Sequence, residues 1–285
     1  MKTIWVLENI KEHKSFYTKF DLLLLLTSTS QWKKHHPTYT CCLYCDKMTH
    51  DLIKDLNAIQ LWDEINIIPK NKFIDKSVFW ASSKLEVLSR MTEPVIIMDN
   101  DFIVYKPLHD FLKDTIVGTH DEDGTEYYIN SSDPYIKQAK HIINRPNLNA
   151  INVSFLYLPD PKFTQYYAKT SLELMELFTK IKVPNSKYLI YAEQLLLLHL
   201  ITINNVSYNT LMKGKWLCSE NKYSIGDKGY LSMEQSNMHF RHYWMDKPKI
   251  RNSEEGFSYE KEIKQLENAI KIHTFIDRNG LNTLK

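Results

Sequence analysis

Glycine is scarce in this chain, which limits how a phosphate group could be held. Only 7 of the 285 residues are glycine, and neither glycine-rich phosphate-binding pattern, GxGxxG or GxxxxGK[ST], occurs. A bound nucleotide would therefore need a metal ion and basic side chains in place of a glycine-rich loop. Neither sign of charge dominates, since 36 Lys and Arg face 34 Asp and Glu. This balance argues against nucleic acid binding as the main task.

Cysteine is also rare, and its positions favour neither a disulfide framework nor a zinc site. Three of the four cysteines, Cys41, Cys42 and Cys45, lie in one apolar run, and the fourth is Cys218. We expect buried free thiols. The first residues do not resemble a signal peptide, and the apolar run Leu22–Leu26 is too short to span a bilayer. We expect a cytoplasmic protein with no transmembrane segment.

Strand-like and helix-like segments alternate along the first half of the chain. This alternation predicts an α/β fold with a mostly parallel, Rossmann-like central sheet flanked by helices. Residues 119–147 are predicted to be mainly loop and 236–244 to be extended. No repeat or low-complexity linker occurs, so we expect one domain over residues 1–285. Strands are expected over 3–7, 39–44, 64–68, 94–98 and 151–158, and helices over 48–59, 77–91, 163–181, 187–203 and 259–273.

Two aspartates, Asp99 and Asp101, follow the apolar run Pro94–Met98. Side chains two residues apart on an extended chain point the same way, so both carboxylates can converge on one object. Carboxylates at the end of a buried strand are costly without a positive charge between them. Mn²⁺ or Mg²⁺ would bind there and leave coordination positions for phosphate oxygens. The alternatives are a simple Asp turn or the two-metal site of a nuclease or nucleotidyltransferase.

Four blocks of sequence carry a resemblance to a known enzyme group. They are Trp80–Leu85 with Pro94–Val104, then Asn152–Leu158, then Glu193-Gln194-x-x-Leu197, and finally His239-Phe240 with Lys247-Pro248. In this order they resemble the motifs of GT-A-fold glycosyltransferases, most closely family 8, the glycogenin and lipopolysaccharide galactosyltransferase group. The chain departs from that pattern at Lys84, where the family usually has Arg, and at Glu193, where it has Asp. The spacing from His239 to Lys247 is also longer than in the family.

The resemblance implies a single GT-A-type domain, with residues 1–118 binding the nucleotide sugar and 119–285 binding the acceptor. It implies a metal-dependent hexosyl- or pentosyltransferase that moves a sugar from a nucleotide-diphosphate sugar, by default a UDP-sugar, to a glycan or other hydroxyl acceptor. A catalytically silent binding protein with the same fold stays open as an alternative. No nucleic acid partner is expected.

The resemblance also assigns roles to individual residues. His239 is the first choice as a third metal ligand beside Asp99 and Asp101, and His242 is the second. Donor contacts are expected from Glu8, Asn9, Lys84, Asn152 and Lys247. The alternatives are a simple turn for Glu8 and Asn9, an exposed helix face for Lys84 and a solvated basic loop for Lys247.

Glu193 and Gln194 are the expected catalytic residues. They interrupt a helix that is otherwise apolar almost all round, and a buried carboxylate normally has a partner or a task. In an inverting enzyme Glu193 would be the general base, and in a retaining enzyme it would stabilise an oxocarbenium-like sugar. The acidic run Asp121–Asp123 is expected to be a solvated loop, with the acceptor mouth as its alternative role.

Overall fold

The computed structural model divides the chain into two compact units. Unit 1 comprises Met1, Pro69–Ile97 and Asp110–Ser236, and unit 2 comprises Lys2–Ile68, Met98–His109 and Asn237–Lys285. The single domain over residues 1–285 stays a prediction. Within these ranges the structure describes residues 1–8, 18–68, 73–124, 129, 132–143, 149–244, 246–254, 258–270 and 276–282.

Unit 2 contains three parallel strands, β1 (Lys2–Leu7), β2 (Thr40–Cys45) and β3 (Glu64–Ile67), close to the predicted ranges. β2 lies between the other two, with Ile4 opposite Cys42 and Leu43 opposite Ile65. The cysteines of β2 are buried and free, as predicted. Burial raises the pKa of each of their thiols to about 12. These thiols therefore pack as small apolar groups.

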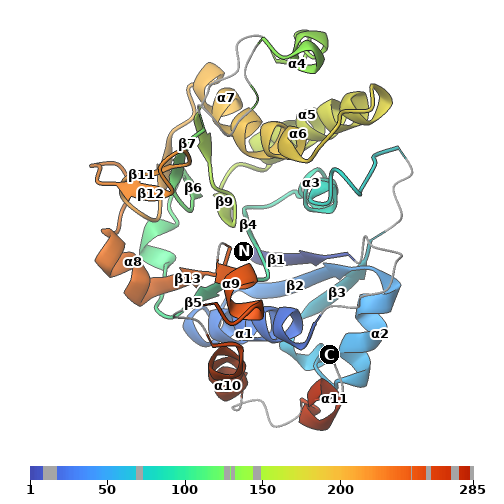
Figure 1. Ribbon diagram of the computed structural model, residues 1–285, viewed down its shortest axis with the longest axis vertical. Helices are drawn as coiled ribbons and strands as arrows, with labels where there is room; N and C mark the ends of the chain where they lie inside the picture. The colour runs from blue at the N-terminus through green and yellow to red at the C-terminus, as the bar shows by residue number, and fades with distance from the viewer. Residues whose placement is uncertain are drawn as a thin grey trace. The chain divides into compact units, whose positions relative to one another are not determined.

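The helix α1 (Lys19–His35) was not predicted from the sequence. Thr18 and Asp21 begin it with reciprocal side-chain-to-backbone hydrogen bonds, which form a capping box. α1 packs against α10 (Tyr259–Ile270) and β5 (Phe102–Val104), as Figure 1 shows for the two helices. The buried Ser28 hydroxyl accepts from Trp5 Nε1 at 3.0 Å and donates to the Phe102 carbonyl at 2.7 Å. Ser28 thus links β1 to β5.

The remaining elements of unit 2 differ from the predictions mainly in their ends. The helix expected over 48–59 ends at Asp55. The segment 236–244, predicted to be extended, is helical up to His239 and only then becomes a strand, which pairs antiparallel with β5. The elements are α2 (Lys47–Asp55), a 3₁₀ turn (Ile59–Leu61), β13 (Phe240–His242), α9 (Asp246–Arg251) and α11 (Arg278–Asn282). Two elements lie where the units meet along the chain, a 3₁₀ turn (His109–Phe111) and α8 (Met233–His239).

Unit 1 contains strands of two sheets. In one, the order is β10-β6-β9-β4, with β10 parallel and β9 antiparallel to β6. In the other, the order is β12-β11-β7-β8. The strands are β4 (Val95–Met98), β6 (Ile116–Gly118), β7 (Asp121–Asp123), β8 (Asn149–Ile151), β9 (Phe155–Leu158), β10 (Tyr208–Thr210), β11 (Lys215–Leu217) and β12 (Lys222–Ser224).

Two sequence predictions for unit 1 are wrong. The acidic run Asp121–Asp123 is strand β7, paired with both β8 and β11, and not a solvated loop. Its central residue Glu122 is only 4% exposed. The single strand expected over 151–158 is split into β8 and β9, because the chain changes sheets between Asn152 and Ser154.

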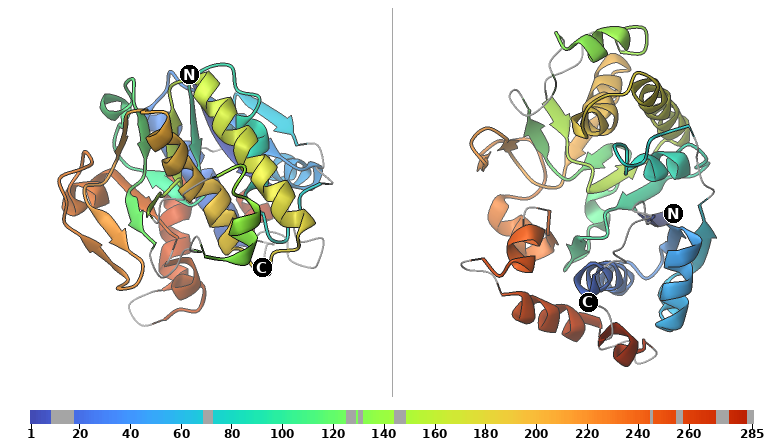
Figure 2. Two further views of the ribbon diagram at one scale, coloured as in Figure 1. Left: turned by 90° about the horizontal axis from the view of Figure 1, so that it is seen from above. Right: turned by 45° about the vertical axis from the view of Figure 1, so that its right-hand side comes forward.

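Two helical segments of unit 1 pack against α5 (Pro161–Lys180). The side chain of Asp160 caps this helix, and Pro161 occupies its first turn. α5 packs against α3 (Ser82–Leu88) and against the helical run 187–203, which lies beside it in Figure 2. That run consists of α6 (Lys187–Ile190), a π-helical turn (Tyr191–Leu195) and α7 (Leu196–Ile203). The short helix α4 (Pro134–Gln138) precedes β8 in the chain.

The fold class is therefore mixed α/β, with a mostly parallel central sheet and flanking helices, as predicted. Among the described residues, no helix is both long enough and apolar enough to cross a membrane.

Candidate metal centre

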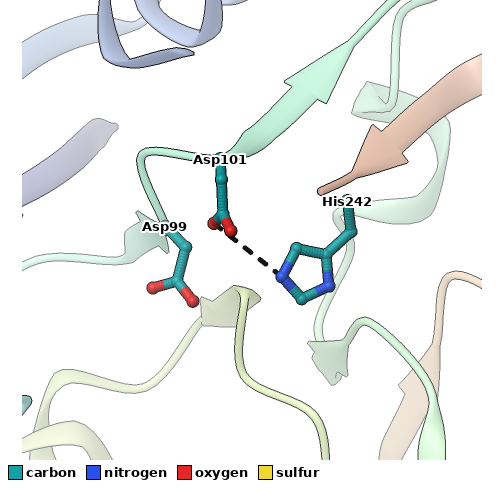
Figure 3. Close-up of side chains that lie close together, drawn as sticks. All are labelled: Asp99, Asp101 and His242. Atoms are coloured by element: carbon teal, nitrogen blue, oxygen red, sulfur yellow. Dashed lines mark ion pairs between the residues drawn. The ribbon is translucent and has the colours of Figure 1, made fainter. Parts of the chain in front are cut away.

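Asp99 and Asp101 lie in the tight turn that follows strand β4. The Asp99 carbonyl accepts a hydrogen bond from the Phe102 backbone N–H at 3.1 Å, which closes the turn and starts β5. Asp101 is only 3% exposed, whereas Asp99 is half-buried. Both carboxylates lie on one side of the turn in Figure 3. The convergence predicted from the sequence is present.

Strand β13 brings His242 to the same place. It pairs antiparallel with β5 so that His242 lies opposite Phe102, the neighbour of Asp101. The Tyr243 N–H donates to the Asp101 carbonyl at 3.1 Å and extends this pairing into the turn. His242 Nε2 lies 3.8 Å from Asp101 Oδ1 (Figure 3). One oxygen from each aspartate and one nitrogen of His242 lie within 4.8 Å of one another.

His239, the first choice from the sequence, is not part of this group. It is the last residue of α8, and its carbonyl accepts from the Tyr105 and Lys106 N–H groups at 2.6 and 3.2 Å. The structure thus favours the second choice, His242. The pairing of β13 with β5 brings His242 to the two carboxylates, and the sequence predicted no such pairing.

The donor atoms of this group fit a divalent cation such as Mn²⁺ or Mg²⁺. Two carboxylates and one imidazole offer two hard oxygens and a nitrogen and leave other coordination positions for ligand oxygens. Burial alone would raise the pKa of the Asp101 carboxyl. The charges of His242 and Lys247, and the hydrogen bond from Lys247, instead hold this pKa below its ordinary value. These charges favour the carboxylate form of Asp101, which already has the Lys247 ammonium at one oxygen.

Lys247 also contacts Asp101. It lies in the first turn of α9, and its backbone N–H donates to the Tyr243 carbonyl at 2.9 Å. Its Nζ lies 2.6 Å from Asp101 Oδ2, and its side chain is 26% exposed. The alternative of a solvated basic loop is therefore wrong, because Lys247 is helical and paired with a buried carboxylate.

An arginine on the same strand stabilises the segment that carries His242 and Lys247. Arg241 contacts Asp246 at the start of α9 and Glu262 of α10, both at 3.3 Å. Its guanidinium also lies 4.0 Å from the centre of the Tyr243 ring. These contacts fix β13 and the first residue of α9 to one helix of unit 2.

In unit 1, the structure pairs two residues that the sequence singled out separately. Lys84 Nζ of α3 lies 3.3 Å from Glu193 Oε1, and the two side chains are only 12% and 6% exposed. The alternative that Lys84 lies on an exposed helix face is therefore wrong. Glu193 lies in the π-helical turn, a feature frequent at functional sites. The buried Tyr167 hydroxyl donates to its carbonyl at 3.0 Å.

Asn152 belongs to a buried polar network in unit 1. Its Nδ2 donates to Glu122 Oε1 at 2.7 Å, and its Oδ1 accepts from the Ser154 hydroxyl at 2.7 Å. His120 Nδ1 lies 4.0 Å from the same Glu122 oxygen. The sequence did not single out Ser154 or His120, since nothing in it predicted the pairing of β7 with β8.

The other predicted site residues have simpler surroundings. Glu8 directly follows β1 and is half-buried, whereas Asn9 lies outside the described residues. Gln194 is half-buried in the π-helical turn, next to Glu193. The donor-binding and catalytic roles of all these residues stay predictions.

One protein family matches most of this chain. Residues 1–255 match a family described as "Family of unknown function (DUF6734)". The chain belongs to DUF6734. No curated protein matches this DUF6734 member.

Solved structures with partial similarity to this DUF6734 chain include two named glycosyltransferases. A galactosyltransferase, LgtC, in complex with donor and acceptor sugar analogs is 14% identical, with a TM-score of 0.43 over 73% of each chain. The glycosyltransferase GlyE of Streptococcus pneumoniae TIGR4 is 11% identical, with a TM-score of 0.39 over 74% of this chain and 45% of its own. An active-site mutant of LgtC is 13% identical, with a TM-score of 0.39 over 67% of this chain and 69% of its own. All three TM-scores lie below 0.5.

Proposed function

We propose that this chain is a metal-dependent glycosyltransferase of GT-A type. It would transfer a sugar from a nucleotide-diphosphate sugar, by default a UDP-sugar, to a glycan or other hydroxyl acceptor. One observation carries the proposal: Asp99, Asp101 and His242 each offer a ligand atom within 4.8 Å of the others, at the turn that follows β4, where the motif resemblance expects a metal–diphosphate site.

The candidate metal group and Lys247 would bind the diphosphate. Asp99, Asp101 and His242 would hold Mn²⁺ or Mg²⁺, which when bound supplies positive charge to the phosphate oxygens of the leaving group. Lys247 would donate to the same oxygens, since its ammonium already lies 2.6 Å from a ligand carboxylate. Glu8 would contact the nucleobase.

Glu193 and Gln194 would act on the sugar. Glu193 would face the reacting carbon as a charged carboxylate, and Lys84 would keep it charged and oriented. Gln194 would donate a hydrogen bond to a sugar hydroxyl. Asn152 would act by holding Glu122 and Ser154 in place. Both stereochemical outcomes fit these roles, with Glu193 as general base for inversion or as an electrostatic stabiliser for retention.

Calorimetric titration with UDP, with and without Mn²⁺, tests the proposal. Wild-type protein should bind UDP much more tightly with Mn²⁺. Asp101→Asn keeps the shape but removes a ligand charge, so it should lose this dependence, whereas Asp114→Asn at an exposed position should not. A folded Asp101→Asn protein that keeps Mn²⁺-dependent UDP affinity would refute the metal assignment.

A turnover assay beside the same titration separates catalysis from binding. Glu193→Gln should abolish Mn²⁺-dependent hydrolysis or transfer of the nucleotide sugar while UDP affinity stays close to wild type. If Glu193→Gln retains full turnover on a substrate of the wild-type enzyme, the carboxylate is structural only.

Two-metal nuclease chemistry is less well supported. It needs further carboxylates around a second ion. In the part of the chain that the structure describes, one group of three or more metal-capable side chains is found, and it holds only two carboxylates. A silent binding protein would bind UDP with Mn²⁺ and turn over none of a panel of nucleotide sugars.

A further inference from the structure

We propose that Lys247 and a divalent cation compete for Asp101, so that cation and diphosphate bind this chain cooperatively. The inference rests on the proposed function, because it takes the diphosphate as the second ligand. It adds a coupling between the two ligands that neither the motif nor the metal-binding residues imply.

The competition follows from how the Asp101 carboxylate is shared. Oδ2 accepts from Lys247 Nζ at 2.6 Å, and Oδ1 faces His242 at 3.8 Å. Asp101 is 3% exposed, so water screens the ammonium poorly from any cation placed on the other oxygen. A divalent ion held by Asp99, Asp101 and His242 would lie close to Lys247 and repel it. Lys247 must leave Asp101, or the cation binds weakly.

The surroundings of Lys247 allow its side chain to move while its backbone stays in place. Its N–H is held by the Tyr243 carbonyl at 2.9 Å, and the preceding Asp246 is held by Arg241 at 3.3 Å. The side chain itself is 26% exposed and has a flexible four-carbon stem. Only side-chain torsions therefore need to change to release Asp101.

A diphosphate gives the released ammonium a new anionic partner. Without a diphosphate, a bound cation breaks the contact between Lys247 and Asp101, and Lys247 gains no new anionic partner. With it, Lys247 exchanges one anion for another, and the cation faces no competing charge. Each ligand should therefore raise the affinity for the other by the same factor. The Lys247–Asp101 contact therefore disfavours a cation that binds alone and favours one that binds together with a diphosphate.

The substitution Lys247→Met tests this coupling, because it keeps the length of the stem and removes the ammonium. Mn²⁺ affinity is measured without nucleotide, and UDP affinity is then measured at saturating Mn²⁺, both by calorimetry. We expect Lys247→Met to bind Mn²⁺ alone on the order of tenfold more tightly and UDP on the order of tenfold more weakly. These opposite changes are the signature of competition.

Lys249→Met is the matched control. It removes the same charge from the same short helix, two residues further along the chain. A general effect of net charge would tighten Mn²⁺ binding equally in both variants. Lys247→Gln repeats the measurement with a polar side chain in case Met at position 247 perturbs folding.

The outcomes distinguish the coupling from the proposed function. If wild-type protein binds UDP with Mn²⁺ but Lys247→Met binds Mn²⁺ alone no more tightly than Lys249→Met does, the coupling is refuted and the function stands. If neither wild type nor either Lys247 variant binds Mn²⁺ at all, both proposals are wrong. If Mn²⁺ alone binds more tightly to both Lys247 variants than to the control, and UDP binds more weakly, the coupling is supported.

Discussion

Removing one partner of the Lys84–Glu193 pair should destabilise the protein strongly. The two charged atoms lie 3.3 Å apart, and the side chains are 12% and 6% exposed. Loss of one partner of such a buried pair typically costs about 3–5 kcal/mol, because the remaining charge stays buried without compensation. The residual exposure of Lys84 places Lys84→Met at the lower end, about 3 kcal/mol. For a chain of this size that corresponds to a decrease in Tm of roughly 6 °C.

A double-mutant cycle gives the sharpest assay. Lys84→Met and Glu193→Met should each cost about 3 kcal/mol, whereas the double variant should cost no more than either alone, because it buries no unpaired charge. Urea unfolding monitored by circular dichroism gives the free energies of unfolding. Lys47→Met at the exposed Lys47–Asp51 pair is the control and should have no measurable effect. Costs that add within about 0.5 kcal/mol would mean that the two charges do not interact.

Two further predictions concern stability. Gly118→Ala should cost about 1–3 kcal/mol in urea unfolding, because the new Cβ would lie 2.2 Å from Ile151 Cγ2; an unchanged midpoint would contradict this packing. Burial lowers the pKa of His36 to about 4, and its Nε2 accepts from the Leu108 N–H at 2.9 Å. The unfolded chain therefore binds this proton first as the pH falls, so up to roughly 3 kcal/mol of stability should be lost between about pH 6.5 and 4. His36→Gln should flatten that part of the stability–pH curve, and an equally steep curve in the variant would assign the loss to other groups.

Periodicity and strand propensity predicted most of the fold. They located β1, β2, β3 and α5, and the helical run 187–203. They missed α1 because almost every residue from Phe20 to Ser30 is buried, so no polar face marks a helix. They misplaced the acidic run 121–123 because strand formation there depends on two partner strands distant in sequence.

The candidate site was predictable only where it is local in sequence. Asp99 and Asp101 converge because they are two residues apart. Lys84 and Glu193 are 109 residues apart, and neither residue's own pattern reveals the other as its partner. The choice of His242 over His239 likewise depends on strand pairing. The local sequence thus identified the candidate site residues, whereas tertiary contacts determine which of them lie close together.

In the helical run 187–203, the π-helical turn Tyr191–Leu195 makes the number of residues as important for the structure as their type. A π turn holds an extra residue, so the side chains before and after it are out of phase by about 100° compared with an uninterrupted α-helix. Deleting one residue inside the turn could restore a regular α-helix with all its backbone hydrogen bonds. It would also rotate α6 relative to α7 and turn Glu193 away from Lys84. The segment should therefore tolerate many apolar substitutions but no insertion or deletion, and natural variation in this family should preserve its spacing more strictly than its residues.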